Sequence, residues 1–143
     1  MKTTKSFKTT LTHSMLSLAN RKNIFASQLP LAIKSFIQSQ FQGKSIIFAE
    51  KNDESLHYMY EVNLDNGTLL SFNHRGEWTK IINNVESIPA SIIPSAIHHF
   101  VDYYFPEAMI VMFNKRATGY IIGLSNNVTL KYNNEGHIYG LAS

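Results

Sequence analysis

Tyr60-Glu61-Val62-Asn63-Leu64-Asp65-Asn66-Gly67-Thr68-Leu69-Leu70-Ser71-Phe72 is the stretch that decides the fold. Its first five residues alternate between apolar and polar side chains, which is the period of a strand with one buried face. The residues Asp65-Asn66-Gly67 accept the positive φ angles of a tight hairpin turn. The stretch therefore predicts two antiparallel strands, at 56–64 and 68–72, joined by that turn.

The same pattern occurs a second time along the chain. Leu29-Pro30 aligns with Ile93-Pro94, and further along, after a slightly shorter offset, Tyr60 aligns with Tyr120. The offset changes in the polar stretch 51–54, where a turn tolerates a change of length. We therefore interpret the chain as a tandem duplication with repeats 29–88 and 89–143.

Each repeat is predicted to contain one helix followed by about four strands. Apolar residues at helical spacing mark the helices, and they are Ile33, Phe36, Ile37 and Phe41, then Ile97, Phe100, Val101, Tyr104 and Phe105. Pro30 and Pro94 suit the first helical residue, because that position needs no N–H donor. The predicted strands are 45–50, 56–64, 68–72 and 77–82, then 109–114, 120–124, 128–132 and 137–141. The predicted fold class is α+β, a doubled α-β-β-β-β unit whose two helices pack on one face of an antiparallel sheet.

Positive charge is concentrated at the N-terminus. Residues 1–28 hold five of the 13 basic residues and no acid, so we interpret them as a basic, Ser/Thr-rich leader or disordered arm. The rest, 29–143, is predicted to be a single domain with eight basic and ten acidic residues, which argues against nucleic-acid binding. No apolar run has the length of a secretory signal or a transmembrane helix, so membrane insertion is not expected.

The chemistry-bearing residues form no catalytic motif. The sequence has no cysteine, and its six histidines are scattered without metal-ligand spacing. We therefore predict a protein without enzymatic activity, cofactor or metal. Trp78 is predicted to lie in the core, with an aromatic anchor at a binding surface as the alternative.

The sheet face opposite the helices is the predicted binding surface. Strand alternation places a set of apolar and charged residues there, and they are Met59, Glu61, Leu69, Ile81, Val111, Phe113, Ile121, Lys131 and Tyr139. The leading hypothesis is a binding protein that engages a protein or peptide through this face, as an inhibitor or regulator. Two alternatives stay open: a small-molecule or lipid carrier with a cleft between helices and sheet, and a hydrolase built from dispersed Glu and His. The sequence leaves the oligomeric state open.

The chain resembles the putative β-lactamase-inhibitor-like, PepSY-like family of bacterial envelope proteins. The resemblance rests on Leu29-Pro30, Tyr60–Leu64, Asn66-Gly67, Phe72-Asn73-His74-Arg75-Gly76-Glu77-Trp78, Ile88-Pro89, Ile93-Pro94, 120–124 and Tyr132-Asn133-Asn134-Glu135-Gly136. It implies a saddle-shaped sheet, no catalytic residue, and a location in the periplasm or cell envelope. The chain departs from the family pattern at Asn127 and Ile138, where the first repeat has glycine and tryptophan, and it has no evident signal peptide.

Overall fold

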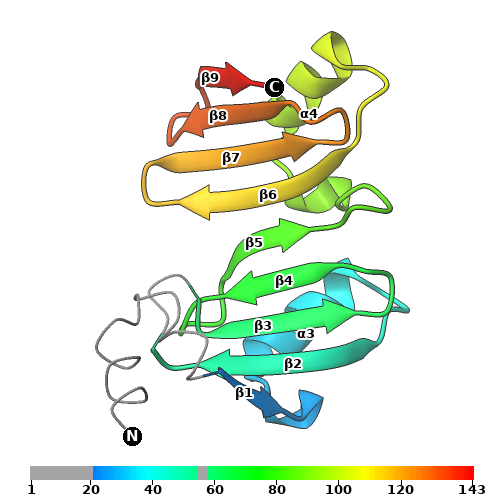
Figure 1. The fold of residues 1–143 in the computed structure, drawn as a ribbon, viewed down its shortest axis with the longest axis vertical. Coiled ribbons are helices and arrows are strands. Elements are labelled where there is room, and N and C mark those ends of the chain that lie inside the picture. The colour runs from blue at the N-terminus through cyan, green and yellow to red at the C-terminus, as the bar shows by residue number, and fades with distance from the viewer. Residues whose placement is uncertain (1–20, 55–57) are drawn as a thin grey trace, which may run out of the picture.

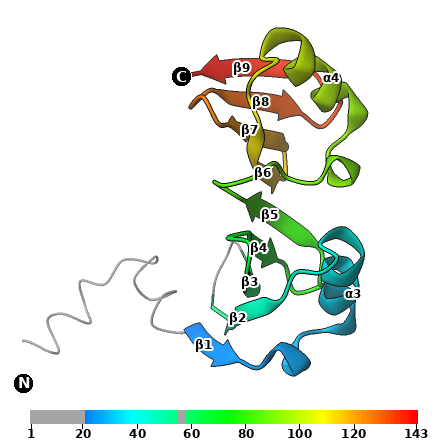
Figure 2. The same ribbon diagram turned by 90° about the vertical axis from the view of Figure 1, so that its right-hand side faces the viewer.

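The computed structural model describes residues 21–54 and 58–143. Within them the chain forms one open sheet of nine strands, in the spatial order β1 to β9, with every neighbouring pair antiparallel. The two α-helices lie on the same face of the sheet (Figures 1 and 2). The predicted α+β class, the two helices and the antiparallel sheet are confirmed.

The elements fall close to their predicted positions. The helices are α3 (Leu31–Gln40) and α4 (Ser95–Tyr104), and two 3-10 helices precede them, η1 (Ala26–Gln28) and η2 (Ala90–Ile92). The strands are β1 (Arg21–Ile24), β2 (Ile46–Asn52), β3 (Tyr60–Leu64), β4 (Leu69–Phe72), β5 (Trp78–Ile82), β6 (Ile110–Arg116), β7 (Gly119–Leu124), β8 (Thr129–Asn133) and β9 (Ile138–Ala142). The start of the predicted strand 56–64 lies partly outside the described residues.

Both helices begin in the same way. Pro30 and Pro94 occupy the N-cap position, with φ of −54° in each case, so each helix begins one residue later than predicted. The Pro30 carbonyl accepts hydrogen bonds from the N–H groups of Ile33 (3.1 Å) and Lys34 (3.2 Å). The proline ring holds φ close to its helical value, so the chain enters the first turn at little entropic cost.

The core lies between the helices and the sheet. Side chains of residues paired in register share a face, and one such row is buried along seven neighbouring strands: Ala49, Val62, Leu70, Ile81, Phe113, Ile122 and Leu130. Aromatic edges join helix to sheet, with ring centroids 5.8 Å apart for Phe36–Phe72 and 6.2 Å apart for Phe100–Tyr132. These contacts place both helices on the buried face.

Residues 21–28 do not form the predicted disordered arm, while the alternative of a basic leader stays a prediction. Part of this segment is the ordered strand β1, which pairs with β2, and η1 follows it. Local sequence carries no strand signal there, because β1 is specified by the hydrogen-bonding edge of β2 rather than by its own alternation. Residues 1–20 lie outside the described part of the chain.

The two halves share irregularities as well as elements. Register shifts occur between Ile46 and Phe48 and between Ile110 and Met112, which are equivalent positions in the alignment of the two repeats. Two further shifts, at Ser71/Phe72 and Lys131/Tyr132, also lie at equivalent positions. These parallels agree with a duplication, which stays a prediction.

Asn127 takes the place of a turn glycine, as the sequence predicted. Its φ is +69°, close to the +86° of Gly67 in the first half. Asparagine adopts this left-handed region more readily than most residues do. Both turns are closed by an asparagine side chain, since the Oδ1 atoms of Asn66 and Asn126 accept from the N–H groups of Thr68 and Val128, each at 3.1 Å.

Gly119→Ala tests how closely β7 and β8 approach. A Cβ at Gly119, where φ is +146°, would lie 1.9 Å from the Tyr132 carbonyl oxygen. At Gly136, with φ of +83°, a Cβ would meet nothing within 4 Å. We expect Gly136→Ala to cost about 1–2 kcal/mol in the free energy of unfolding, and Gly119→Ala at least about 3 kcal/mol, as measured by urea denaturation. Equal losses would contradict the predicted clash.

Candidate functional site

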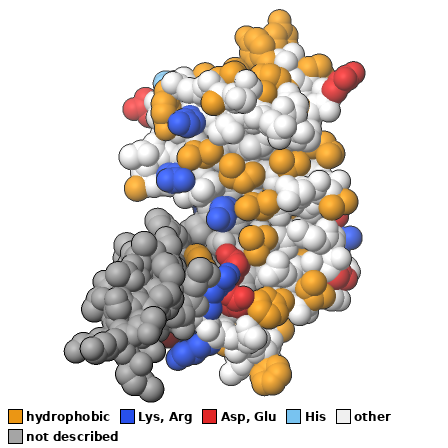
Figure 3. Space-filling view, viewed as in Figure 1, with side chains coloured by type: hydrophobic (Ala, Val, Ile, Leu, Met, Phe, Trp, Pro, Cys, Tyr) orange, Lys and Arg blue, Asp and Glu red, His pale blue; other side chains and the backbone are white. Residues whose placement is uncertain are grey.

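The sheet face opposite the helices, called the open face below, is the candidate functional site (Figure 3). Two neighbouring rows of paired residues cross it. The first row is Glu50, Glu61, Ser71, Lys80, Asn114, Ile121 and Lys131, and the second is Leu69, Ile82, Met112, Gly123 and Thr129.

Two residues predicted for this face lie on the other one. Ile81 and Phe113 are 0% and 1% exposed and belong to the core. β-bulges are the reason, because an extra residue in one strand reverses the alternation beyond it. The bulge in β5 turns both Trp78 and Ile81 toward the helices. The bulge in β6, between Ile110 and Met112, turns both Ile110 and Phe113 toward the helices. The prediction for Ile81 and Phe113 is therefore wrong.

The remaining predicted residues have different surroundings. Leu69 and Ile121 are partly exposed on the open face, and Lys131 is exposed there. Val111 lies within the bulge of β6, and Met59 packs against the core while partly buried. Tyr139 is 61% exposed on the edge strand β9. Residues that the sequence prediction missed are Lys80, Ile82 and Met112, which only the bulges bring to this face.

An apolar band crosses the middle of the open face. Leu69, Ile82, Met112 and Ile121 come from the four consecutive strands β4 to β7, and each is partly exposed. A Cβ at Gly123 would lie 3.0 Å from Met112 Cβ and 3.3 Å from its Cε, so the Met112 side chain lies across the glycine. Figure 3 shows hydrophobic side chains gathered over these strands. This apolar band is therefore partly accessible on the open face.

Two lysines border the apolar band. Lys80 lies beside Asn114 in the sheet, and Lys131 lies beside Ile121. A Cβ at Gly140 would lie 3.3 Å from Lys131 Cδ, so the lysine stem runs along the sheet surface. Within residues 21–54 and 58–143, neither ammonium has a carboxylate within 4.0 Å. These two positive charges are therefore not neutralised by the described part of the chain.

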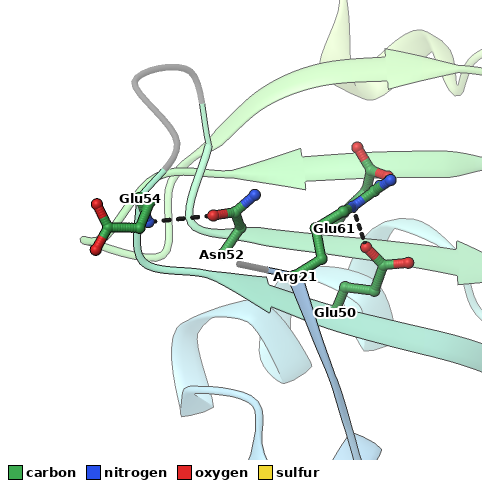
Figure 4. A network of polar contacts seen from close by, with 5 residues as sticks. All are labelled: Arg21, Glu50, Asn52, Glu54 and Glu61. Carbon is green, nitrogen blue, oxygen red and sulfur yellow. Dashed lines mark hydrogen bonds and ion pairs between the residues drawn. The ribbon is translucent and has the colours of Figure 1, made fainter. Parts of the chain in front are cut away.

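A compact ion-pair cluster occupies the β1 end of the open face (Figure 4). Arg21 Nη2 donates a hydrogen bond to Glu61 Oε1 at 2.8 Å. Arg21 Nε and Glu50 Oε2 form an ion pair, but their geometry is not that of a hydrogen bond. The carboxylate side chains are only 13% and 14% exposed. Desolvation lowers the pKa of Arg21, but Tyr58, Glu50 and Glu61 raise it by more, so the net pKa lies above the ordinary value. Glu61, predicted to bind a partner, thus binds Arg21.

Trp78 lies on the helix side of the sheet. Its ring meets Phe113 edge-on at 5.1 Å, and Phe113 meets Tyr120 at 5.3 Å. Lys115 Nζ lies 3.9 Å from the Trp78 ring centroid, a cation–π contact. Burial lowers the pKa of Lys115, and Glu77 offsets part of that effect. Trp78 thus packs against the core while partly buried, and the alternative role as an aromatic anchor stays a prediction.

Hollows near the helices bear on the carrier hypothesis. The smallest of three, about 140 Å³, lies between the end of α3, the start of β4 and the segment 83–89, and its wall includes Thr68 and Asn83. Asn83 Nδ2 donates to Thr68 Oγ1 at 2.8 Å. Pockets for drug-sized ligands measure roughly 300–1,000 Å³. Two larger hollows, at 41–46 and 105–108, are shallow and open. In the described residues, no three His, Asp or Glu side chains gather as a metal site.

Comparison with known proteins identifies the family. The model of the family described as "Putative beta-lactamase-inhibitor-like, PepSY-like" matches residues 58–139. The chain belongs to this PepSY-like family. The resemblance inferred from the sequence is therefore confirmed. No curated protein matches the chain.

Solved structures share the fold of this PepSY-like chain. A putative calcium-regulated periplasmic protein from Bacteroides thetaiotaomicron is 27% identical, with a TM-score of 0.82, over 88% of this chain and 99% of that one. A putative periplasmic protein from Bacteroides vulgatus is 24% identical, with a TM-score of 0.78, over 87% and 98% of the two chains. A second protein from that species, of unknown function, has 23% identity, a TM-score of 0.80, and coverage of 86% and 99%. In the described part of the PepSY-like chain, no helix is long and apolar enough to span a membrane.

Arg21→Met tests whether the ion-pair cluster holds β1 on the sheet. The change keeps an unbranched, flexible side chain, although a shorter one, and leaves two partly buried carboxylates without their cation. We expect the free energy of unfolding to fall by about 1–3 kcal/mol. Lys22→Met on the same strand is the control, and because Lys22 is exposed we expect a loss below about 0.5 kcal/mol. Similar losses in the two variants, measured by urea denaturation, would show that the cluster contributes no special stability.

Proposed function

We propose that this PepSY-like protein is a non-catalytic periplasmic binding protein whose open face engages a protein or peptide, as an inhibitor or regulator. The observation that carries the proposal is the apolar band of Leu69, Ile82, Met112 and Ile121 on the face opposite both α3 and α4. Apolar patches bordered by polar residues mark interaction sites on soluble proteins. Membership of an inhibitor-like family and the periplasmic relatives support the same reading.

The charges beside the apolar band define the partner's chemistry. Lys80 and Lys131 have no carboxylate partner among the described residues, whereas Glu50 and Glu61 both pair with Arg21. A partner with acidic groups next to apolar side chains would pair with both lysines while covering the band. Electrostatic complementarity of this kind adds mainly specificity and association rate. The proposed partner is therefore an acidic, apolar segment of a protein.

Ile121→Glu combined with Met112→Glu tests the apolar band. The probe is a displayed library of random peptides, and affinities of the selected peptides are measured by calorimetry. We expect selection of peptides that combine Asp or Glu with large apolar residues, and a rise in Kd of at least about ten-fold for the double variant. The control is Val85→Glu, which puts a carboxylate at an apolar position that is 76% exposed in the connector before η2.

Unchanged peptide affinity in the double variant, with the fold verified by circular dichroism, would remove the open face from the proposal. The open face would also be removed from the proposal if the Val85→Glu control lost affinity to the same extent, because net charge would then explain the loss.

Charge reversal tests the lysines separately. We expect Lys80→Glu combined with Lys131→Glu to lose affinity for the acidic peptides and to gain affinity for peptides in which Lys replaces Asp and Glu. The physical reason is that the introduced carboxylates repel acidic peptides and attract basic ones. The measurement is the Kd of both peptide sets at low and at physiological ionic strength. A preference that does not change sign would contradict the proposed role of the two lysines.

A further inference from the structure

The sheet ends on two edges with different chemistry. The outer strand β1 carries Arg21 and Lys22, and charged residues on an edge discourage pairing with another strand. The opposite outer strand, β9, reads Ile138-Tyr139-Gly140-Leu141-Ala142 and has neither a charge nor a proline. Its three large side chains are exposed by 37%, 61% and 57%, in chain order. The β9 edge therefore lacks the side chains with which natural sheets block pairing.

β9 contains a bulge, and bulges on an edge strand can discourage pairing with a further strand. The first half of the chain shows that a bulge of this kind does not prevent such pairing. The register shift of β8 and β9 at Lys131/Tyr132 matches that of β4 and β5 at Ser71/Phe72. Beyond its shift, β5 still pairs with β6 through residues 80–82. The equivalent positions of the second repeat are 140–142 of β9, which pair with β8 as 80–82 pair with β4. A strand of this geometry thus has a working outer edge.

Helix α4 extends the exposed apolar surface at the same end of the molecule. Figures 1 and 2 both place α4 beside the last strands of the sheet. Its last two residues, Tyr103 and Tyr104, are exposed by 78% and 60%, and their rings lie 4.8 Å apart. At the equivalent positions α3 has the polar residues Ser39 and Gln40. The β9 end of the molecule therefore combines an open backbone edge with exposed aromatic rings.

We propose that β9 pairs with β9 of a second copy of this chain, antiparallel, around a two-fold axis perpendicular to the sheet. A neutral strand meets no electrostatic repulsion from its own copy, and each Leu141, which has Leu130 beside it on β8, gains an apolar neighbour on its exposed outer side. A two-fold axis perpendicular to the sheet maps each face of the sheet onto the same face. The helices of both copies therefore lie on one side of the joined sheet, and α4 approaches α4 of the second copy. The contact is isologous and closes as a dimer. It does not depend on the proposed function of the open face.

The first experiment measures the mass of the full chain against concentration by sedimentation equilibrium. We expect a reversible dimer, and we expect Tyr139→Lys combined with Leu141→Lys to raise its dissociation constant at least about ten-fold, because lysines on an edge strand oppose pairing. The control is Leu31→Lys, which places one lysine at an apolar position that is 75% exposed at the start of α3. A chain that stays monomeric over the whole concentration range would overturn the proposal.

The second experiment locates the contact, and it works even where the lysine variant fails to fold. The chain has no cysteine, so a single introduced cysteine can form a disulfide only with another copy. In an antiparallel pair the residue on the axis faces itself with Cα atoms about 4.5–5.5 Å apart, which a disulfide can bridge. We expect cross-linked dimer to peak at one position in a cysteine scan of residues 138–142 and to be absent for Asn23→Cys on β1. Cross-linking that needs one cysteine in β1 and one in β9 would overturn the proposal in favour of a head-to-tail contact.

Discussion

One buried row of side chains holds the two layers of this protein together. The row crosses seven strands from Ala49 to Leu130, and each helix inserts its apolar stripe against it. Burial of a large apolar side chain contributes about 1.5–3 kcal/mol, so the row makes a large contribution to the stability of the sheet. Both helices must then lie on one face, because only that face has a continuous apolar surface. The other face is left accessible as a consequence of how the core is built.

β-bulges decide what the accessible face looks like. Without the bulges at β5 and β6, strict alternation would expose Ile81 and Phe113 and would bury Ile82 and Met112. With them, the largest side chains of the middle strands enter the core, and Lys80, Ile82 and Met112 appear on the open face. One extra residue thus changes both the packing of the core and the chemistry of the surface. The description of the family names no ligand, and among the relatives reported above the Bacteroides thetaiotaomicron protein is described as calcium-regulated.

The two edge strands of the sheet differ in side-chain charge. At one edge Arg21 ties β1 to Glu50 and Glu61, so that one positive and two negative charges on three strands form ion pairs near the open face. At the other edge β9 has no charge and leaves Tyr139 and Leu141 exposed. An unpaired strand edge offers backbone donors and acceptors to any extended chain nearby. Side-chain charge is what distinguishes the two ends.

The amino-acid sequence by itself determined the two helices, the hairpin turns and eight of the described strands, since periodic side chains and turn residues act over a few neighbours. It also identified the PepSY-like family through the order of its motifs. Only the tertiary structure decided that residues 21–24 form a strand, that Arg21 neutralises Glu61, and that Ile81 and Phe113 face the helices. Each of these depends on a partner strand: an edge to pair with, a carboxylate brought near, or a bulge that shifts the register. Such contacts join residues far apart in the chain, and local periodicity carries no record of them.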